Sequence, residues 1–106
     1  LNLKDPFVFT GYDHDEDQGT VIALFKDGNR VDVLDEEGDV VFDRSCFYAE
    51  SGGQVADKGI ISNVSCKGEV LDVKKAPNGQ FLHHVKVKEG SIKENDVFDL
   101  KIKFLE

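Results

Sequence analysis

The fold of this chain is decided by residues 20–34, which read Thr-Val-Ile-Ala-Leu-Phe-Lys-Asp-Gly-Asn-Arg-Val-Asp-Val-Leu. Residues 20–26 and 30–34 are rich in β-branched and large apolar side chains, a composition that favours strands. Between them, Asp27-Gly28-Asn29 is a turn signal, because Asp-Gly tolerates the positive φ angles of a two-residue hairpin turn. The stretch therefore predicts a β-hairpin.

Similar β-rich runs follow along the rest of the chain. Residues 39–43, 65–75 and 80–88 are candidate strands, and residues 76–79, Ala-Pro-Asn-Gly, form the clearest hairpin turn. In residues 98–104, apolar and polar side chains alternate strictly, which is the pattern of a half-buried strand. The dominant period of the sequence is thus two, as in β-structure.

The connections between these runs are too short for parallel crossovers, so the predicted strands are antiparallel. Only residues 91–95 hint at a single helical turn. About six to eight short strands in a chain of this length imply a sandwich or a small barrel. We favour the barrel, because closure removes exposed strand edges. The predicted fold class is all-β, a small antiparallel β-barrel.

At 106 residues the chain fits one domain, 1–106, whose core needs neither metal nor disulfide. It contains no apolar run long enough to span a membrane and no signal-peptide pattern. Because it starts without methionine and stops within an apparent strand, we expect a piece of a larger chain, with residues 1–6 as a candidate linker remnant. Cys46 and Cys66 are expected to be free thiols, as in a reducing cytosol.

Charge differs between the two halves of the chain. The 13 basic and 21 acidic residues give a formal net charge of -8. Residues 1–53 hold 4 basic and 13 acidic residues, a net of -9, whereas residues 54–106 hold 9 and 8, a net of +1. A protein that grips nucleic acid needs a basic surface, because counterion release supplies most of that affinity. The sequence therefore predicts a weak nucleic-acid binder.

Two groups of residues superficially suggest metal binding. Residues 13–17 carry carboxylates at alternate positions, but Gln18 and Leu24 stand where an EF-hand needs glycine and glutamate, so we interpret them as a solvated acidic loop. His83 and His84 are adjacent, and on a strand their side chains point to opposite faces. They cannot chelate one metal ion together, and we expect no metal site in this chain.

Nucleophilic catalysis has equally little support in the sequence. A Cys46 nucleophile would need a lowered thiol pKa, an orienting group and oxyanion donors, and no spacing indicates them. Ser51 lacks the Gly-x-Ser-x-Gly elbow, and no phosphate-binding motif follows the glycines. We therefore expect no catalytic residue.

The most distinctive segment is residues 46–59, which read Cys-Phe-Tyr-Ala-Glu-Ser-Gly-Gly-Gln-Val-Ala-Asp-Lys-Gly. An aromatic pair precedes a carboxylate, a hydroxyl, two adjacent glycines and a carboxamide. Glycines admit positive φ angles and the close approach of a ligand or another backbone. By residue chemistry alone the simplest interpretation is a wide surface turn between two strands, because most loops only connect.

This segment resembles the Thr-Pro-Phe-Tyr-Ala-Glu-Ser-Gly-Gly-Gln-Val-Gly-Asp-x-Gly signature of alanyl-tRNA synthetases. The match is unbroken over residues 47–55 and resumes at Asp57 and Gly59. Weaker similarity extends over nearly the whole chain, from residues 9–12 to the last predicted strand.

Three positions depart from the signature. Ser45, Cys46 and Ala56 stand where the family more often has Thr, Pro and Gly. The start of the loop is therefore less rigid than usual in the family, while the Glu-Ser-Gly-Gly-Gln core of the signature is unchanged.

The resemblance implies a β-barrel like that of translation elongation factors, placed immediately before the editing domain of the synthetase. It implies that the loop lines the edge of the editing cleft beside the tRNA 3′ end, with Gln54 offering an amide donor. The residues concerned are Glu50, Ser51, Gly52, Gly53 and Gln54. The barrel would be non-catalytic and inert alone, supporting aminoacylation of alanine tRNA and hydrolysis of tRNA mischarged with serine or glycine.

The same resemblance implies a cytoplasmic parent enzyme, a class II ligase that uses ATP, magnesium and zinc and acts on alanine tRNA. The family's zinc ligands lie in His-x-x-x-His and Cys-x-x-x-His motifs, and neither occurs in this chain. We expect no cofactor in this fragment, no membrane partner, and tRNA contact only through the parent and its adjacent editing domain.

Two alternatives stay open. The stand-alone editing hydrolases of the same superfamily more often read Pro-Glu-Gly-Gly-Gly-Gln-Pro where this chain has residues 49–55, so the synthetase version fits better. A generic β-barrel interaction module would share the strands and the acidity but has no reason to carry this loop. A His-x-x-x-His motif beyond residue 106 would support the editing hypotheses, and a class II catalytic core upstream would select the synthetase.

Overall fold

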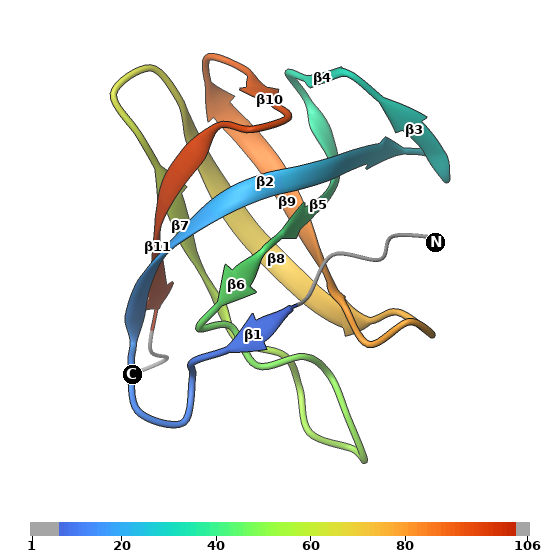
Figure 1. The fold of residues 1–106 in the computed structure, drawn as a ribbon, viewed down its shortest axis with the longest axis vertical. Helices are drawn as coiled ribbons and strands as arrows, with labels where there is room; N and C mark the ends of the chain where they lie inside the picture. The colour runs from blue at the N-terminus through green and yellow to red at the C-terminus, as the bar shows by residue number, and fades with distance from the viewer. Residues whose placement is uncertain (1–6, 104–106) are drawn as a thin grey trace.

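The computed structural model describes residues 7–103, and all regular structure in that range is β (Figure 1). The strands are β1 (Val8–Phe9), β2 (Glu16–Lys26), β3 (Asn29–Val31), β4 (Val33–Leu34), β5 (Glu37–Phe42), β6 (Arg44–Ser45), β7 (Lys58–Ser62), β8 (Lys67–Lys75), β9 (Phe81–Glu89), β10 (Ile92–Lys93) and β11 (Val97–Lys103). No helix in the described range is long and apolar enough to cross a membrane.

Six strands form a closed antiparallel barrel. Their order is β2-β11-β7-β8-β9-β5, and β5 pairs with β2 to close the ring, while β3 extends β2 outside it. This arrangement confirms the predicted all-β antiparallel barrel. Because the ring is closed, each of the six strands has a neighbouring strand on both sides. This protects the sheet from pairing with other chains.

The sequence signals that predicted these strands act as expected. The β2–β3 turn has positive φ at both central residues, 52° at Asp27 and 80° at Gly28, which is the type I′ geometry that fits strand twist. Along β11, Phe98, Leu100 and Ile102 are buried, and the residues between them are exposed. One face of β11 therefore packs into the core and the other meets solvent.

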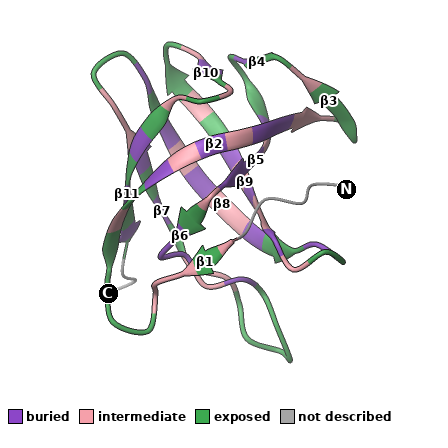
Figure 2. Ribbon diagram, viewed as in Figure 1, coloured by how far each residue is buried: buried purple, intermediate pink, exposed green. Residues whose placement is uncertain are grey.

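The core fills the inside of the barrel, as the buried positions along the strands show (Figure 2). Its largest fully buried side chains include Phe42, Phe47 and Phe98. At the upper end in Figure 1, Leu34 of β4 pairs with Ile92 of β10, and both side chains are buried. This small pair covers that end of the barrel.

One predicted element was wrong, and a second is divided in two. Residues 91–95 contain no helical turn, because Ile92 is held in a strand pair and Val21 exchanges backbone hydrogen bonds with Asn95 and Asp96. Residues 30–34 form two short strands with a bend at Asp32, so that Leu34 can turn into the core.

Strand boundaries and one pairing also differ from expectation. β5 starts at Glu37, two residues before the predicted start at residue 39, and it includes Gly38, where a side chain would collide with Leu34. The short strands β1 and β6 pair in parallel, across the long excursion through β2 and β5. The candidate linker remnant at residues 1–6 and the predicted strand residue Phe104 lie outside the described residues.

Candidate functional site: a hairpin at one end of the barrel

The signature segment forms a tight hairpin between β6 and β7 that projects from the lower end of the barrel (Figure 1). At its tip Ser51 and Gln54 exchange backbone hydrogen bonds, with N–H to O=C distances of 3.3 and 2.9 Å. Gly52 and Gly53 between them have φ angles of +53° and +88°. Positive φ at both central residues defines a type I′ turn, so the segment is a surface turn between two strands, as expected, but its tip is tight rather than wide.

The stem of this hairpin is fixed by backbone and carboxylate hydrogen bonds. Tyr48 N–H donates to the Asp57 carboxylate at 2.8 Å, and Asp57 N–H donates to the Tyr48 carbonyl at 3.0 Å. Glu50 N–H donates to the Val73 carbonyl of β8 at 2.9 Å. We call residues 48–57 the motif hairpin. These bonds anchor its two sides to each other and one side to the barrel.

Part of the signature serves the barrel itself. Phe47 and Ala49 are buried and pack in the core. Gly59 lies against β11 so closely that an added Cβ would overlap the Lys101 carbonyl and the Phe47 ring. Asp57 accepts a hydrogen bond from the Tyr48 amide. Structural roles in the barrel or the hairpin stem therefore account for Phe47, Ala49, Asp57 and Gly59.

The five predicted site residues lie together at the tip of the motif hairpin, and all are exposed (Figure 2). They are Glu50, Ser51, Gly52, Gly53 and Gln54, which we call the tip residues. Among residues 7–103, none of their side chains makes a hydrogen bond or ion pair. A Cβ added at either glycine would meet nothing within 4 Å. The glycines therefore serve the turn geometry and leave open space beside it.

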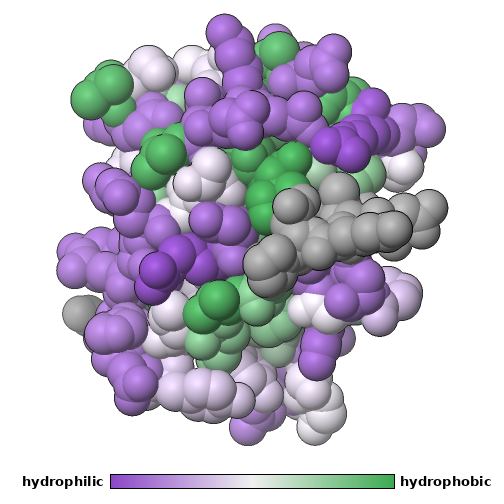
Figure 3. Space-filling model, viewed as in Figure 1, coloured by the Kyte–Doolittle hydropathy of each residue, from purple (hydrophilic) through white to green (hydrophobic). Residues whose placement is uncertain are grey.

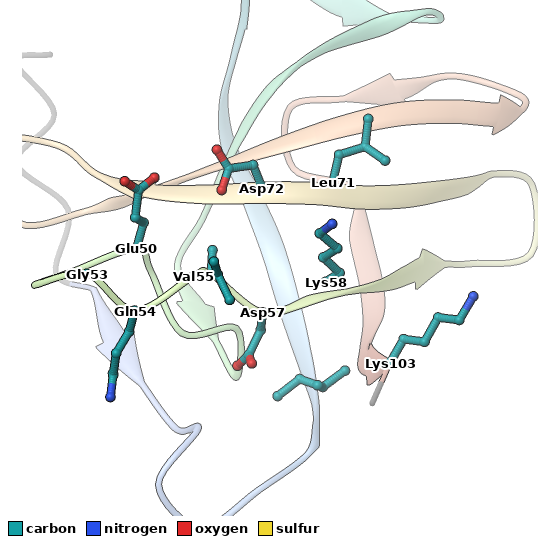
Figure 4. A pocket seen from close by; sticks show the side chains of 11 residues that line it. Glu50, Gly53, Gln54, Val55, Asp57, Lys58, Leu71, Asp72 and Lys103 are labelled. Carbon is teal, nitrogen blue, oxygen red and sulfur yellow. The ribbon is translucent and has the colours of Figure 1, made fainter. Parts of the chain in front are cut away.

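An open groove of about 750 Å³ runs beside the motif hairpin (Figure 4). The motif hairpin supplies one wall, and β8 and the end of β11 supply the other side. Its lining includes the acidic side chains of Glu50, Asp57 and Asp72 and the basic side chains of Lys58 and Lys103. Gln54 points away from Glu50 and Asp72 (Figure 4). The groove thus mixes charges and is not a basic channel.

The β8 and β11 residues of the groove were not predicted from sequence. Leu71 and Asp72 lie where the β8–β9 register shifts between Val70 and Asp72. Lys103 reaches the groove because β11 pairs with β7, which places Lys103 opposite Lys58 at the end of the signature. No local pattern marks the irregularity, and the pairing of distant strands has no signal in a single sequence.

The adjacent histidines point to opposite faces, as predicted. His83 is fully buried, and burial lowers its pKa to about 4. His84 is partly exposed and hydrogen-bonds to Asp39 at 3.0 Å and to Glu37 at 2.7 Å. Within the described range, no three His, Cys, Asp or Glu side chains gather as a metal site.

Both cysteines are buried free thiols in the structure. Burial, assisted by the nearby Asp17 charge, raises the pKa of Cys46 to about 11. Burial also raises the pKa of Cys66. A thiol with a raised pKa is a poor nucleophile at neutral pH, so the geometry gives no support to cysteine catalysis.

The acidic stretch at residues 13–17 is only partly the solvated loop that we expected. Its last two residues belong to β2, and Asp17 accepts hydrogen bonds from Thr10 at 2.6 Å and Arg44 at 3.0 Å. Burial alone would raise the pKa of Asp17, but these donors and the Gln18 amide lower it. Asp17 therefore ties β2 to the chain around β1 and β6.

Comparison with known proteins identifies the class to which this barrel and its motif hairpin belong. Residues 1–104 match the family model described as tRNA synthetases class II (A). The chain therefore belongs to the alanyl-tRNA synthetase family, as the resemblance of its signature implied.

Similar curated relatives are alanine–tRNA ligases from bacteria. The chain is 42% identical over 103 residues to the one from Geobacillus thermodenitrificans, covering 95% of this chain and 12% of the relative. It is 46% identical over 96 residues to the one from Pseudomonas entomophila, covering 89% of this chain and 11% of the relative. The chain thus corresponds to a fragment, about an eighth of the length of these proteins.

Proposed function

We propose that this barrel is a non-catalytic part of an alanine–tRNA ligase, in which the motif hairpin lines the cleft where mischarged tRNA is hydrolysed. The tip residues lie beside the tRNA 3′ end, with their backbone and the Gln54 amide facing the substrate. The barrel thereby supports both aminoacylation of alanine tRNA and editing of tRNA that carries serine or glycine.

One observation carries this proposal: the signature divides into residues that build the barrel and residues that do not. Phe47, Ala49, Asp57 and Gly59 have structural contacts. The tip residues are exposed and, within the described chain, their side chains bind nothing. A rigid turn presenting an open backbone and an amide is suited to contact a group outside the barrel.

The charges around the motif hairpin favour a surface that borders the bound tRNA over one that binds it tightly. Glu50, Asp57 and Asp72 lie beside the groove, and only Lys58 and Lys103 oppose them. Three carboxylates repel a phosphate backbone, so the barrel supplies little tRNA affinity of its own. We propose that tRNA is held by other parts of the parent and is only positioned here.

The parent enzyme supplies the chemistry in this proposal. ATP and magnesium serve its aminoacylating part, zinc serves the adjacent editing domain, and the whole acts in the cytoplasm. The barrel contributes neither a nucleophile nor a metal ligand. The synthetase hypothesis is preferred to the stand-alone hydrolase, because the similar relatives named above are all alanine–tRNA ligases.

The test uses a full-length alanine–tRNA ligase carrying this barrel, with Gly53→Val at the tip. A β-branched residue at φ +88° strains the turn and fills the open space beside it. We expect hydrolysis of mischarged seryl-tRNA to fall by about tenfold or more, because small displacements at a reacting site are costly. Alanylation of the tRNA should change little.

The matched control is Gly28→Val in the β2–β3 turn. Gly28 also has positive φ and nothing within 4 Å of an added Cβ, but it lies far from the motif hairpin (Figure 1). It carries a similar backbone strain and should leave hydrolysis unchanged. If Gly53→Val and Gly28→Val enzymes edit equally well, the proposed role of the tip is wrong.

A further inference from the structure

The imidazole of His83 lies in the core directly beneath the start of the motif hairpin. It is fully buried in β9, and its ring lies edge-on to Phe42 and to Phe47, with centroid separations of 5.1 and 5.7 Å. Burying a polar ring among aromatic side chains is costly unless its nitrogen atoms are hydrogen-bonded. Both nitrogen atoms of His83 have partners.

These partners define a directional chain of hydrogen bonds. His83 Nδ1 lies 3.1 Å from the Val40 carbonyl, which can only accept, so Nδ1 carries the proton. In a neutral ring Nε2 then accepts, and it does so from the Ser45 hydroxyl at 2.7 Å. The Ser45 oxygen in turn accepts from the Phe47 N–H at 3.0 Å. The lowered pKa of His83 agrees with a neutral ring.

The chain of bonds ends where the backbone leaves the barrel for the motif hairpin. Ser45 is the last residue of β6, and Phe47 directly precedes the hairpin stem. With its hydroxyl both donating and accepting, Ser45 has one favoured side-chain orientation.

We propose that His83 is a positioning residue for the motif hairpin, acting through the Ser45 hydroxyl to fix the direction in which the chain departs at Phe47. Its effect on hairpin order is independent of what the hairpin contacts. Only its consequence for editing rests on the proposed function.

The test is an NMR comparison of this chain with its Ser45→Ala and Ser45→Thr variants. Ser45→Ala removes the link, so the Phe47 amide should exchange with solvent about tenfold faster or more, and the Gly52 and Gly53 amides should show lower heteronuclear NOE values. The His83 Nε2 resonance should shift as it loses its donor. Ser45→Thr keeps the hydroxyl and should restore the Phe47 protection.

Two further variants separate positioning from general loss of stability. Val85→Ala cuts a fully buried core side chain two residues along β9 but leaves the hydrogen-bond chain intact. His83→Leu removes the anchor while Ser45 remains, and should loosen the same amides as Ser45→Ala. The proposal is overturned if the loosening at Phe47 and Gly53 in Ser45→Ala and His83→Leu is no greater than in Val85→Ala.

The same substitutions in a full-length alanine–tRNA ligase distinguish this inference from the proposed function. Loosened hairpin amides in the isolated chain with slower hydrolysis of mischarged tRNA support both. Loosened amides with unchanged hydrolysis support the positioning role of His83 and contradict the role of the motif hairpin in editing.

Discussion

At the scale of single residues, His83 and His84 are neighbours whose pKa values move in opposite directions. Burial among Phe42 and Phe47 lowers the pKa of His83 to about 4. Partial burial alone would also lower the pKa of His84, but hydrogen bonds to Glu37 and Asp39 outweigh it and raise the pKa. A fall in pH should therefore weaken the fold through His83, and a rise in pH should weaken it through the ion pairs of His84.

His83 should make the fold sensitive to acid. Its folded pKa of about 4 lies below the unfolded value of about 6.5, so the unfolded state binds a proton first as the pH falls. The stability that neutral His83 contributes is present above about pH 6.5 and decreases towards pH 4, by up to roughly 1.4 kcal/mol per pH unit.

Urea unfolding at pH 7.0, 5.5 and 4.5 checks this prediction against His83→Leu, which cannot titrate at this position. The free energy of unfolding of the wild-type chain relative to His83→Leu should drop between the first and last pH. A difference that stays constant over this interval would show that His83 does not remain neutral in the fold.

His84 should have the opposite dependence. Its folded pKa is raised, so its ion pairs stabilise the fold fully below about pH 6.5, and this stabilisation is lost as the pH rises through the folded pKa. An NMR titration of His84 should give a lower pKa in Glu37→Gln, which loses the 2.7 Å contact with Nε2. Glu36→Gln is the control, since Glu36 pairs with Lys26 instead. Equal His84 pKa values in the two variants would contradict the assignment.

At the scale of elements, Gly59 should determine how closely β7 and β11 pack. An added Cβ would overlap the Lys101 carbonyl, so Gly59→Ala must displace backbone and should cost about 2–4 kcal/mol of unfolding free energy. Thermal unfolding monitored by circular dichroism measures this cost. Gly79→Ala is the control, because it strains a positive φ of +90° but meets nothing within 4 Å, and should cost only about 1 kcal/mol.

The elements show which sequence signals carry information. The half-buried strand β11 and the hairpin turn at Asp27-Gly28 were predicted correctly, because each depends on residues that are neighbours in the chain. The β4–β10 pair, the parallel β1–β6 pair and the groove beside the motif hairpin were missed. Each depends on contacts between residues distant in sequence, which a local pattern cannot record.

The sequence of the signature indicated the tip residues but not the structural roles of the residues around them. The resemblance marked the tip residues as a group, and in the structure they lie on one exposed turn, where their proposed contact with tRNA stays a prediction. Sequence alone did not reveal that Gly59 and Asp57 serve the barrel. It also gave no sign that Ser45 and His83, 38 residues apart, are linked.

At the scale of the whole molecule, the net charge is unfavourable for direct binding of nucleic acid. The chain has a formal net charge of -8. The face in Figure 3 is largely hydrophilic, with hydrophobic side chains in separate patches. Exposed charge of this sign opposes the approach of phosphate.

The isolated chain should therefore bind tRNA very weakly. In fluorescence anisotropy at about 0.15 M salt, we expect a Kd above about 100 μM for alanine tRNA, near the weak end of non-specific binding. Binding in the low micromolar range would contradict this prediction, because it would show that the barrel itself contributes much of the affinity for tRNA.

The central claim is that the tip of the motif hairpin lies beside the tRNA 3′ end in the assembled enzyme. The most direct measurement is photo-crosslinking in a full-length alanine–tRNA ligase with p-benzoylphenylalanine in place of Gln54, and in place of Asn29 at the β2–β3 turn as the control. We predict a crosslink from position 54 to the terminal nucleotide of mischarged tRNA and none from position 29. A folded, tRNA-binding enzyme with no crosslink at position 54, or with equal crosslinks at both positions, would contradict the claim.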